Sequence, residues 1–352
     1  MEAWLLREWQ QGSGWQFVLR PLSWIYALLT SLRRALFRAG LFSVQRVSVP
    51  VIVIGNITVG GTGKTPLVLA LVLHLQASGW RCGIISRGYA RESDDSPPGT
   101  VIHVVAPSQA SSLRPVISDE AALLASRSGV PVYTAADRPA AARALLSAHP
   151  DVDVIVCDDG LQHYALHRDI EICVIDGARG FGNGALLPAG PLREPESRLL
   201  QVDAIVTNGH AADAGAGIAK LAPRVPRYSM SLGNESLVRV GDGKIISVED
   251  AIAEFSGRQI IAVAGTGNPA RFFAHLSAIG LVPSVTQAFP DHHPYAAADF
   301  RHAPEAIVVM TEKDAVKCSQ FADDRMWFMR VDAILPKAFG DFIVQRLSEL
   351  EK

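Results

Sequence analysis

The chain has 352 residues, of which 49% are hydrophobic and 19% are charged; this suits one large α/β domain or two smaller ones and argues against disorder. The formal net charge of −2 excludes a protein that binds polyanions over its whole surface, so nucleic acid is not an expected partner. The four scattered cysteines predict free thiols, and neither a secretory signal nor a transmembrane helix is expected.

The first 46 residues form a segment with a composition of its own. They contain four of the six tryptophans and six arginines, against two acidic residues. Residues 22–32 are apolar, and Arg33, Arg34 and Arg38 follow within the same predicted helix. This mixture is typical of a short helix that lies on a bilayer surface. A helix packed on the core, with its arginines in solvent, is the alternative, and the residues alone favour neither.

From residue 47 the sequence alternates between short β-branched runs and helical stretches. Nearly continuous apolar runs that are separated by helices are typical of a parallel sheet covered on both faces. The chain is therefore expected to be an α/β protein with a P-loop NTPase-like parallel core. The strands expected in this core are residues 51–54, 82–85, 153–157, 170–175 and 203–207, with a helix at 66–78.

The remaining sequence predicts a second, smaller α/β lobe. Residues 211–227 are rich in alanine and glycine with weak periodicity, which favours a junction, and a β-hairpin is expected within 231–248. Strands at 260–264 and 306–310 then resume the α/β pattern. The expected divisions are a membrane-associating helical segment (1–46), a nucleotide-binding core (47–210), a junction with a hairpin (211–245) and a C-terminal α/β lobe (246–352).

A glycine-rich loop lies between the first core strand and the first core helix. Residues 55–65 read GNITVGGTGKT, in the strand–loop–helix context of a Walker A loop, which surrounds phosphate oxygens with backbone N–H groups. Lys64 is expected to reach the β- and γ-phosphates of ATP, and the Thr65 hydroxyl to bind Mg²⁺. An ordinary strand-to-helix turn is the alternative. The predicted nucleotide-binding residues are Thr58, Val59, Gly60, Gly61, Thr62, Gly63, Lys64 and Thr65.

Two acidic residues follow the apolar strand at 153–157. Asp158 and Asp159 are expected at the carboxyl edge of the parallel sheet, where ligands bind in such folds. Two carboxylates at this edge suit Mg²⁺ or its water shell, and this interpretation is favoured over a simple Asp-Gly turn. Which of the two binds the ion directly stays open.

Several further motifs narrow the choice of protein family. In chain order they are SRGY at 86–89, SDE at 118–120, DDGLQH at 158–163, LPAGPLRE at 187–194, FPDHH at 289–293 and TEKDAVK at 311–317. Together with the glycine-rich loop, they resemble the lipid A 4'-kinase (tetraacyldisaccharide 4'-kinase) family over nearly the whole chain. Thr58, which replaces the first glycine of the general Walker A pattern, is also similar to that family's loop.

The resemblance implies a specific reaction and place. Members of the family use ATP to phosphorylate the 4'-hydroxyl of a tetraacylated glucosamine disaccharide 1-phosphate. They act at the cytoplasmic face of the inner membrane of Gram-negative bacteria, and no obligate protein partner is expected. The alternatives are a membrane-associated P-loop NTPase without a lipid acceptor and a non-enzymatic membrane-surface module. The Lys64–Thr65 and Asp158–Asp159 pairs disfavour the module.

Two residues are candidates for proton transfer from the sugar hydroxyl. From the residues alone, Asp119 favours a helix cap, whereas the resemblance implies that it is the catalytic base. His292 would orient or tune Asp119 across the two lobes, so that lobe closure completes the site. A polar loop, or a metal site made by Asp291, His292 and His293, is the alternative for His292.

Three more residues are candidates for substrate contacts. Arg193 follows a loop rich in proline and glycine and is expected either to meet a phosphate of ATP or of the lipid, or to be a solvated loop charge. Arg87 and Tyr89 follow the second core strand and are expected to line the acceptor side.

Overall fold

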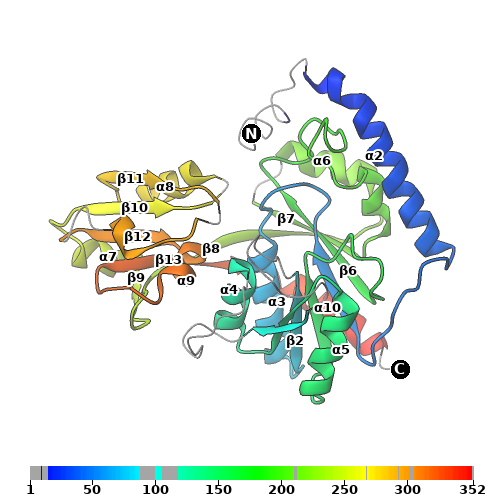
Figure 1. Ribbon diagram of the computed structural model, residues 1–352, viewed down its shortest axis with the longest axis horizontal. Coiled ribbons are helices and arrows are strands. Elements are labelled where there is room, and N and C mark those ends of the chain that lie inside the picture. Colours follow the sequence, from blue (N-terminus) through cyan, green and yellow to red (C-terminus); the bar gives the residue numbers. More distant parts are fainter. Residues whose placement is uncertain are drawn as a thin grey trace.

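The computed structural model shows a larger core lobe and a smaller second lobe side by side, with helix α2 (Trp15–Arg38) along the outer edge of the core lobe (Figure 1). The structure describes residue 9 and residues 15–87, 100–104, 118–209, 212–266, 268–291, 293–300 and 305–350. Within these ranges, none of the helices has the length and apolar character that a bilayer span needs.

The strands of the described ranges form one continuous hydrogen-bonded path through both lobes. Its order is β11-β10-β12-β13-β8-β7-β6-β1-β5-β2-β4-β3, and β9 pairs with β8 outside this path. The strands are β1 (Val51–Gly55), β2 (Cys82–Ser86), β3 (Ile102–Val104), β4 (Val132–Thr134), β5 (Val154–Asp158), β6 (Ile170–Asp176), β7 (Ala204–Asn208), β8 (Arg227–Arg239), β9 (Ile245–Ser247), β10 (Ile260–Ala264), β11 (Val285–Ala288), β12 (Ile307–Thr311) and β13 (Met326–Ile334).

The core sheet is parallel from β4 to the start of β8, and apolar clusters cover both of its faces. β1, β5 and β6 are buried along their whole lengths, which explains their continuous runs of branched apolar residues. The helices of the core lobe, besides α2, are α3 (Lys64–Ala77), α4 (Asp119–Ser128), α5 (Arg138–Ala148) and α6 (Ala212–Leu221).

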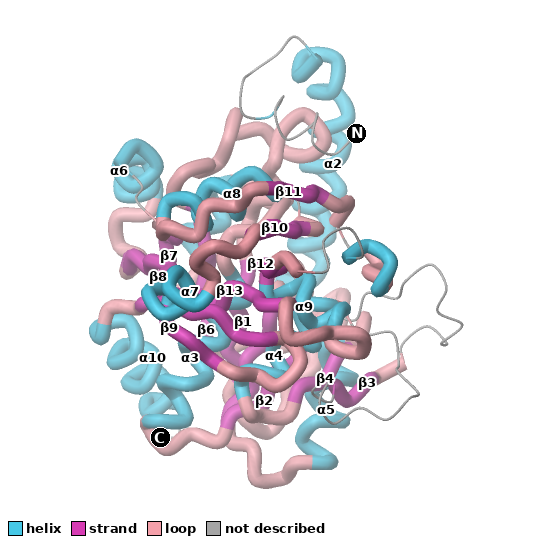
Figure 2. The backbone as a smooth tube through the Cα atoms, turned by 90° about the vertical axis from the view of Figure 1, so that its left-hand side faces the viewer, coloured by secondary structure: helices cyan, strands magenta, loops and turns pink. Residues whose placement is uncertain are grey.

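Strand β8 belongs to both lobes. Its first residues, Arg227–Met230, pair in parallel with β7, and Ser231–Arg239 pair antiparallel with β13. The second lobe also contains α7 (Val248–Glu254), α8 (Pro269–Ala278) and α9 (Glu312–Cys318). In Figure 2, which looks from the side of the second lobe, β13, β12, β10 and β11 follow one another across the front. The last helix, α10 (Lys337–Leu350), returns to the core lobe, where Phe339 and Ile343 pack in the same cluster as α3.

The α/β architecture and the parallel core predicted from the sequence are confirmed, as are all seven predicted strands and the β8–β9 hairpin. Helix α6 occupies much of the stretch 211–227, for which the sequence predicted a junction and no helix. Strands β3, β4, β11 and β13 were not predicted from the sequence. β3 and β4 have three residues each, which is too short for a periodic signal, and polar residues interrupt β11 and β13. Helix α2 begins at Trp15 and passes through Pro21.

Candidate active site

The glycine-rich loop connects β1 to α3 and turns sharply just before the helix. Gly63 has φ +91° and is the residue before Lys64, the first residue of α3. A Cβ on Gly63 would collide with the side chain of Asn208, so both the backbone conformation and the space favour glycine. Asn208, at the end of β7, also donates a hydrogen bond to the carbonyl of Thr62 at 3.2 Å. The neighbouring strand therefore holds the end of the loop.

The first half of the loop is held by a segment far away in the sequence. The Val59 amide donates to the Pro191 carbonyl at 2.8 Å, and the Arg193 amide donates to the Ile57 carbonyl at 2.7 Å. Thr58 forms an antiparallel bridge with Leu192 and does not have a positive φ. The position that is glycine in the general Walker A pattern therefore does not need glycine here.

Lys64 and Asp159 form the centre of the candidate site. Lys64 Nζ lies 3.3 Å from Asp159 Oδ1 and 3.3 Å from Asn56 Oδ1, and Arg193 Nη1 lies 3.3 Å from Asp159 Oδ2. Burial raises the pKa of Asp159, but the two cations outweigh burial and hold the pKa below its usual value. Asp159 also has φ +48°, a left-handed conformation that is uncommon outside glycine and concentrates at functional sites.

Asp158 lies beside this centre but in a different environment. Burial, together with the charge of Asp159, raises the pKa of Asp158 to about 6, although Lys64 opposes the shift. Its Oδ2 is 3.5 Å from the Ser86 hydroxyl, whereas Oδ1 is buried without a hydrogen-bond partner among the described residues. A divalent cation would offset this desolvated charge, so the carboxylate fits a metal ligand.

A cavity of about 310 Å³, which we call the Asp159 cavity, opens beside these residues. It brings together Asp159, Arg193 and Arg87, three of the residues predicted from the sequence. Tyr26 and Arg33 of α2 line it as well, together with Gln162, His163 and Glu194. Burial, reinforced by nearby arginines, lowers the pKa of His163 to about 4, so its ring is neutral near pH 7. Tyr89 lies outside the described residues.

Asp119 is the first residue of α4 and is almost completely buried. Ser118 accepts the capping hydrogen bond from the Ala121 amide, so the interpretation of Asp119 as the helix cap is wrong. Its Oδ2 lies 3.0 Å from Nζ of Lys317, which belongs to α9 of the second lobe. Glu120 contributes to the raised pKa of Asp158, which indicates that the start of α4 lies near the two aspartates at the end of β5.

His292 lies outside the described residues, but its sequence neighbours are described. Lys313 Nζ lies 3.1 Å from Asp291 Oδ1 and 2.9 Å from Glu120 Oε1, so one lysine links the residues next to His292 and Asp119. His293 instead pairs with Asp299 at 3.3 Å. No cluster of three or more metal-binding side chains occurs among the residues that the structure describes, and the three-ligand alternative lies partly outside them because it includes His292.

Sequence reasoning missed several polar residues that shape the site. Arg179 donates to the Gly61 carbonyl and pairs with Asp176 at 2.8 Å, so its guanidinium lies against the phosphate loop. Asp176 and Asn208 end β6 and β7. Polar residues at the carboxyl ends of neighbouring parallel strands were a signal that could have identified them. Lys317 had no comparable signal, because its role depends on contact between the lobes.

The comparisons with known proteins agree with the geometry. A family model described as "Tetraacyldisaccharide-1-P 4'-kinase" matches residues 15–348. The chain is similar to the tetraacyldisaccharide 4'-kinase of Methylobacillus flagellatus (47% identity over 347 residues, 99% of this chain and 96% of that protein) and to that of Ectopseudomonas mendocina (43% over 346 residues, 98% and 97%).

A solved structure extends this similarity to three dimensions. The "apo" form of LpxK from Aquifex aeolicus, in complex with ATP, superposes with a TM-score of 0.78 at 27% identity and covers 94% of this chain and 99% of that chain. The family match and the relatives span nearly every element that builds the candidate site. On this basis, the chain belongs to the tetraacyldisaccharide-1-P 4'-kinase family.

Proposed function

We propose that this protein transfers the γ-phosphate of ATP to the 4'-hydroxyl of a tetraacylated disaccharide 1-phosphate, a step of lipid A biosynthesis. The observation that carries the proposal is the junction of the phosphate loop with the Asp159 cavity: Lys64, which would meet the ATP phosphates, pairs directly with Asp159 in the cavity wall. Phosphoryl transfer depends mainly on positioning and charge stabilisation, and this junction supplies a place for each reactant. ATP would lie on residues 58–65, with the loop amides and the start of α3 around its phosphates.

Mg²⁺ is the metal that the oxygen donors of this site fit best. Thr65 would bind it through its hydroxyl, and Asp158 or Asp159 through a carboxylate, in the manner of a P-loop enzyme. Oδ1 of Asp158, which has no hydrogen-bond partner among the described residues, favours Asp158 as the direct ligand. The ion would neutralise charge that develops on the phosphates. Asp159 is then kept ionised by Lys64 and Arg193.

Asp119 is our candidate for the group that accepts the proton of the attacking hydroxyl, with His292 as its partner. Lys313 supports this pairing, since it links Glu120 and Asp291, the sequence neighbours of the two residues. The partners of Asp119 and Glu120 come from the second lobe, so the relative position of the lobes would control the base.

The acceptor sugar is proposed to enter the Asp159 cavity. Arg87 and Arg193 line this cavity and would contact the sugar or the transferred phosphate, and Tyr89 is proposed to join them. Arg193 is paired with Asp159, and a phosphate would compete with that carboxylate for the guanidinium.

The protein is proposed to lie on the cytoplasmic face of the inner membrane, and helix α2 supports a location at a membrane surface. Its outward side is apolar: Trp24 is 70% exposed, and Phe17, Val18, Leu28 and Leu29 are also exposed. A helix on an ordinary soluble protein buries its apolar side, so this arrangement fits a helix that lies in the bilayer interface. The substrate's acyl chains would then stay in the bilayer while its sugars reach the cavity.

A kinase assay with ATP and the acceptor lipid in neutral detergent micelles tests the proposal. We expect ATP consumption that depends on the acceptor, and loss of transfer in Lys64→Ala because the charge on the β- and γ-phosphates is gone. Lys244→Ala is the matched control, since Lys244 pairs with Glu254 on the surface of the second lobe. ATP hydrolysis that is equally fast without acceptor would identify an NTPase and refute the kinase.

A further inference from the structure

A second cavity, which we call the arginine cavity, lies beneath the C-terminal part of α2. It has a volume of about 350 Å³, and its wall includes Arg34, Arg38, Arg168 and Arg198. Arg34 and Tyr164 line both this cavity and the Asp159 cavity, so the two cavities adjoin. The cavity has no part in the nucleotide site described above.

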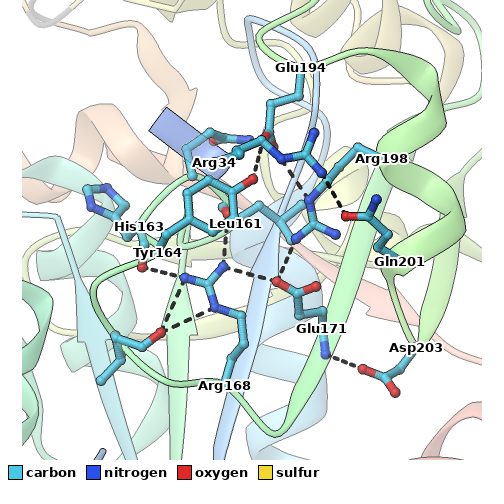
Figure 3. A network of polar contacts seen from close by, with 12 residues as sticks. Arg34, Leu161, His163, Tyr164, Arg168, Glu171, Glu194, Arg198, Gln201 and Asp203 are labelled. Atoms are coloured by element: carbon cyan, nitrogen blue, oxygen red, sulfur yellow. Dashed lines mark hydrogen bonds and ion pairs between the residues drawn. The ribbon is translucent and has the colours of Figure 1, made fainter. Parts of the chain in front are cut away.

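The positive charge of the arginine cavity is only partly compensated. Arg168 and Arg198 converge on Glu171, at 3.0 and 2.6 Å, as Figure 3 shows. Glu194 is the other nearby carboxylate, at 3.7 Å from Arg34 and 3.8 Å from Arg198. Four guanidinium groups thus share two carboxylates, and the excess charge favours an anion.

The arrangement of the donors also favours an anion. Arg34 and Arg38 both donate to Oε1 of Gln201, at 2.7 and 2.5 Å, a neutral acceptor that adds no compensating charge. Arg198 is 2% exposed, and its Nη1 has no hydrogen-bond partner among the described residues. Guanidinium forks bind phosphate oxygens in pairs, and a partly desolvated site strengthens such bonds.

We infer that the arginine cavity binds the phosphate that the acceptor lipid carries at its 1-position, while the 4'-hydroxyl lies in the Asp159 cavity. This inference rests on the proposed function. The acceptor has its reactive hydroxyl on one sugar and its phosphate on the other. The two adjoining cavities match that division. One contains Asp159, the partner of Lys64, and the other is lined by arginines. The exposed apolar residues Leu41, Phe42 and Val44 follow Arg38 closely in the chain.

The consequence is a selection of substrate orientation. With its phosphate held by arginines at one end, the disaccharide can present only its far sugar to Lys64 and the ATP phosphates. The arginine cavity would then select for a phosphorylated acceptor and would exclude the reversed orientation, in which that phosphate would face Asp159.

Arg38 is the best residue for a test, because it is exposed and bonds to a neutral amide, so its removal leaves the ion pairs of Glu171 intact. Steady-state kinetics would be measured in neutral detergent micelles with two acceptors, one with the 1-phosphate and one without it. For Arg38→Ala we expect KM for the phosphorylated acceptor to rise about tenfold or more, with kcat little changed. The KM for the acceptor without phosphate should change by less than about twofold, and Arg38→Lys should recover part of the loss.

Arg20→Ala is the matched control, because Arg20 lies exposed on the same helix but does not line the arginine cavity. We expect it to affect both acceptors equally. An equal loss on both acceptors for Arg38→Ala would overturn the inference, and so would an Arg20→Ala variant that discriminates as strongly as Arg38→Ala.

Added anions distinguish the source of the phosphate. We expect neither inorganic phosphate nor phosphatidylglycerol, at the same mole fraction in the micelles, to remove the preference for the phosphorylated acceptor. If either does so, the cavity takes general phosphate groups, and the assignment to the 1-phosphate is wrong. A wild type that phosphorylates neither acceptor would instead refute the proposed function.

Discussion

Asp158 and Asp159 are adjacent in the chain but have opposite electrostatic environments. Asp159 points to Lys64 and Arg193, which hold its pKa below the usual value against the effect of burial. Asp158 is buried with one weak hydrogen bond, and its pKa is about 6. In the absence of metal, the Asp159 carboxylate therefore stabilises the fold. The ionised Asp158 carboxylate destabilises it, and a bound cation would relieve that destabilisation.

The pH dependence of stability follows from these shifts. The folded-state pKa of Asp158 lies above its unfolded value of 3.8, so the folded protein binds this proton more tightly, and its stability falls as the pH rises from about 4 to about 6. We expect Asp158→Asn to remove this decline and to raise the free energy of unfolding by about 3 kcal/mol at pH 7.5 without ATP and metal. Urea denaturation between pH 4.5 and 7.5 measures both effects.

Asp159→Asn is the matched control at the neighbouring position. The folded-state pKa of Asp159 is lowered. Its contribution to stability is therefore present above the unfolded-state pKa and is lost as the pH falls through the folded-state pKa. Asparagine tolerates the left-handed backbone there, so the loss of the ion pairs should dominate, and the variant should be destabilised at pH 7.5. Destabilisation of both variants to a similar extent would contradict the difference between the two environments.

At the scale of elements, α2 is amphipathic with its polar side turned inward. The Ser23 hydroxyl donates to the Leu186 carbonyl and accepts from the Ala189 amide, both at 2.9 Å, and the Tyr26 hydroxyl donates to the Arg193 carbonyl at 3.0 Å. The apolar side chains on the other side are exposed and do not pack on the core. The exposure of these side chains disfavours the alternative in which α2 packs its apolar side on the core, and the same polar contacts connect α2 to the segment that holds the phosphate loop.

Exposed apolar side chains of α2 should control binding to vesicles without contributing to stability. We expect Trp24→Ser combined with Leu28→Ser to weaken partitioning to anionic vesicles by about tenfold or more, since each large apolar side chain contributes about 1.5–3 kcal/mol when buried. The melting temperature should stay unchanged, because both residues are exposed. Vesicle sedimentation measures the partitioning. Val282→Ser, on an equally exposed residue of the second lobe, is the control, and equal binding of all three proteins would exclude α2 as the membrane contact.

At the scale of the whole molecule, the two lobes meet along α4 and α9. Three ion pairs cross this contact: Lys317 with Asp119 at 3.0 Å, Lys313 with Glu120 at 2.9 Å and Arg127 with Glu312 at 3.2 Å. Arg127 also pairs with Asp332 of β13. The carboxylate that we propose as the base thus belongs to one lobe and is held by the other, so a change in the lobe contact would reposition it.

The proposed pair of Asp119 and His292 makes a prediction about this lobe contact. We expect Asp119→Ala and His292→Ala each to lower kcat by about 10²–10⁴-fold, with ATP affinity retained because neither residue belongs to the phosphate loop. The double variant should be scarcely slower than Asp119→Ala, since effects within one catalytic unit are not additive. A double-mutant cycle on turnover, with nucleotide binding measured in parallel, tests this prediction.

His293→Ala is the control for the loop, because His293 pairs with Asp299 and is expected to have little effect on turnover. Fully additive losses would show that Asp119 and His292 act independently. Normal turnover of Asp119→Ala would exclude Asp119 as the base and make Asp159 the next candidate.

Local features of the fold and site could be predicted from the sequence. The parallel strands were predictable because strands buried on both faces need continuous apolar runs, and the phosphate loop because its glycines and Lys64 must stand at fixed spacing between a strand and a helix. Asp158 and Asp159 could be placed at the sheet edge for the same reason, since the end of an apolar strand marks that edge. The opposite shifts of their pKa values could not be predicted, because they depend on Lys64, Arg193 and burial.

Contacts between distant segments were decided only by the tertiary structure. The pairing of Thr58 with Leu192, the ion pair of Asp119 with Lys317 and the return of α10 to the core lobe each join residues more than a hundred positions apart, or elements of different lobes. The outward apolar side of α2 is of the same kind, since an amphipathic pattern defines two sides of a helix but not which side faces the protein. The sequence by itself determined the elements and the chemistry that each one carries. The long-range contacts determined which of these chemical groups meet, because they depend on how the whole chain packs.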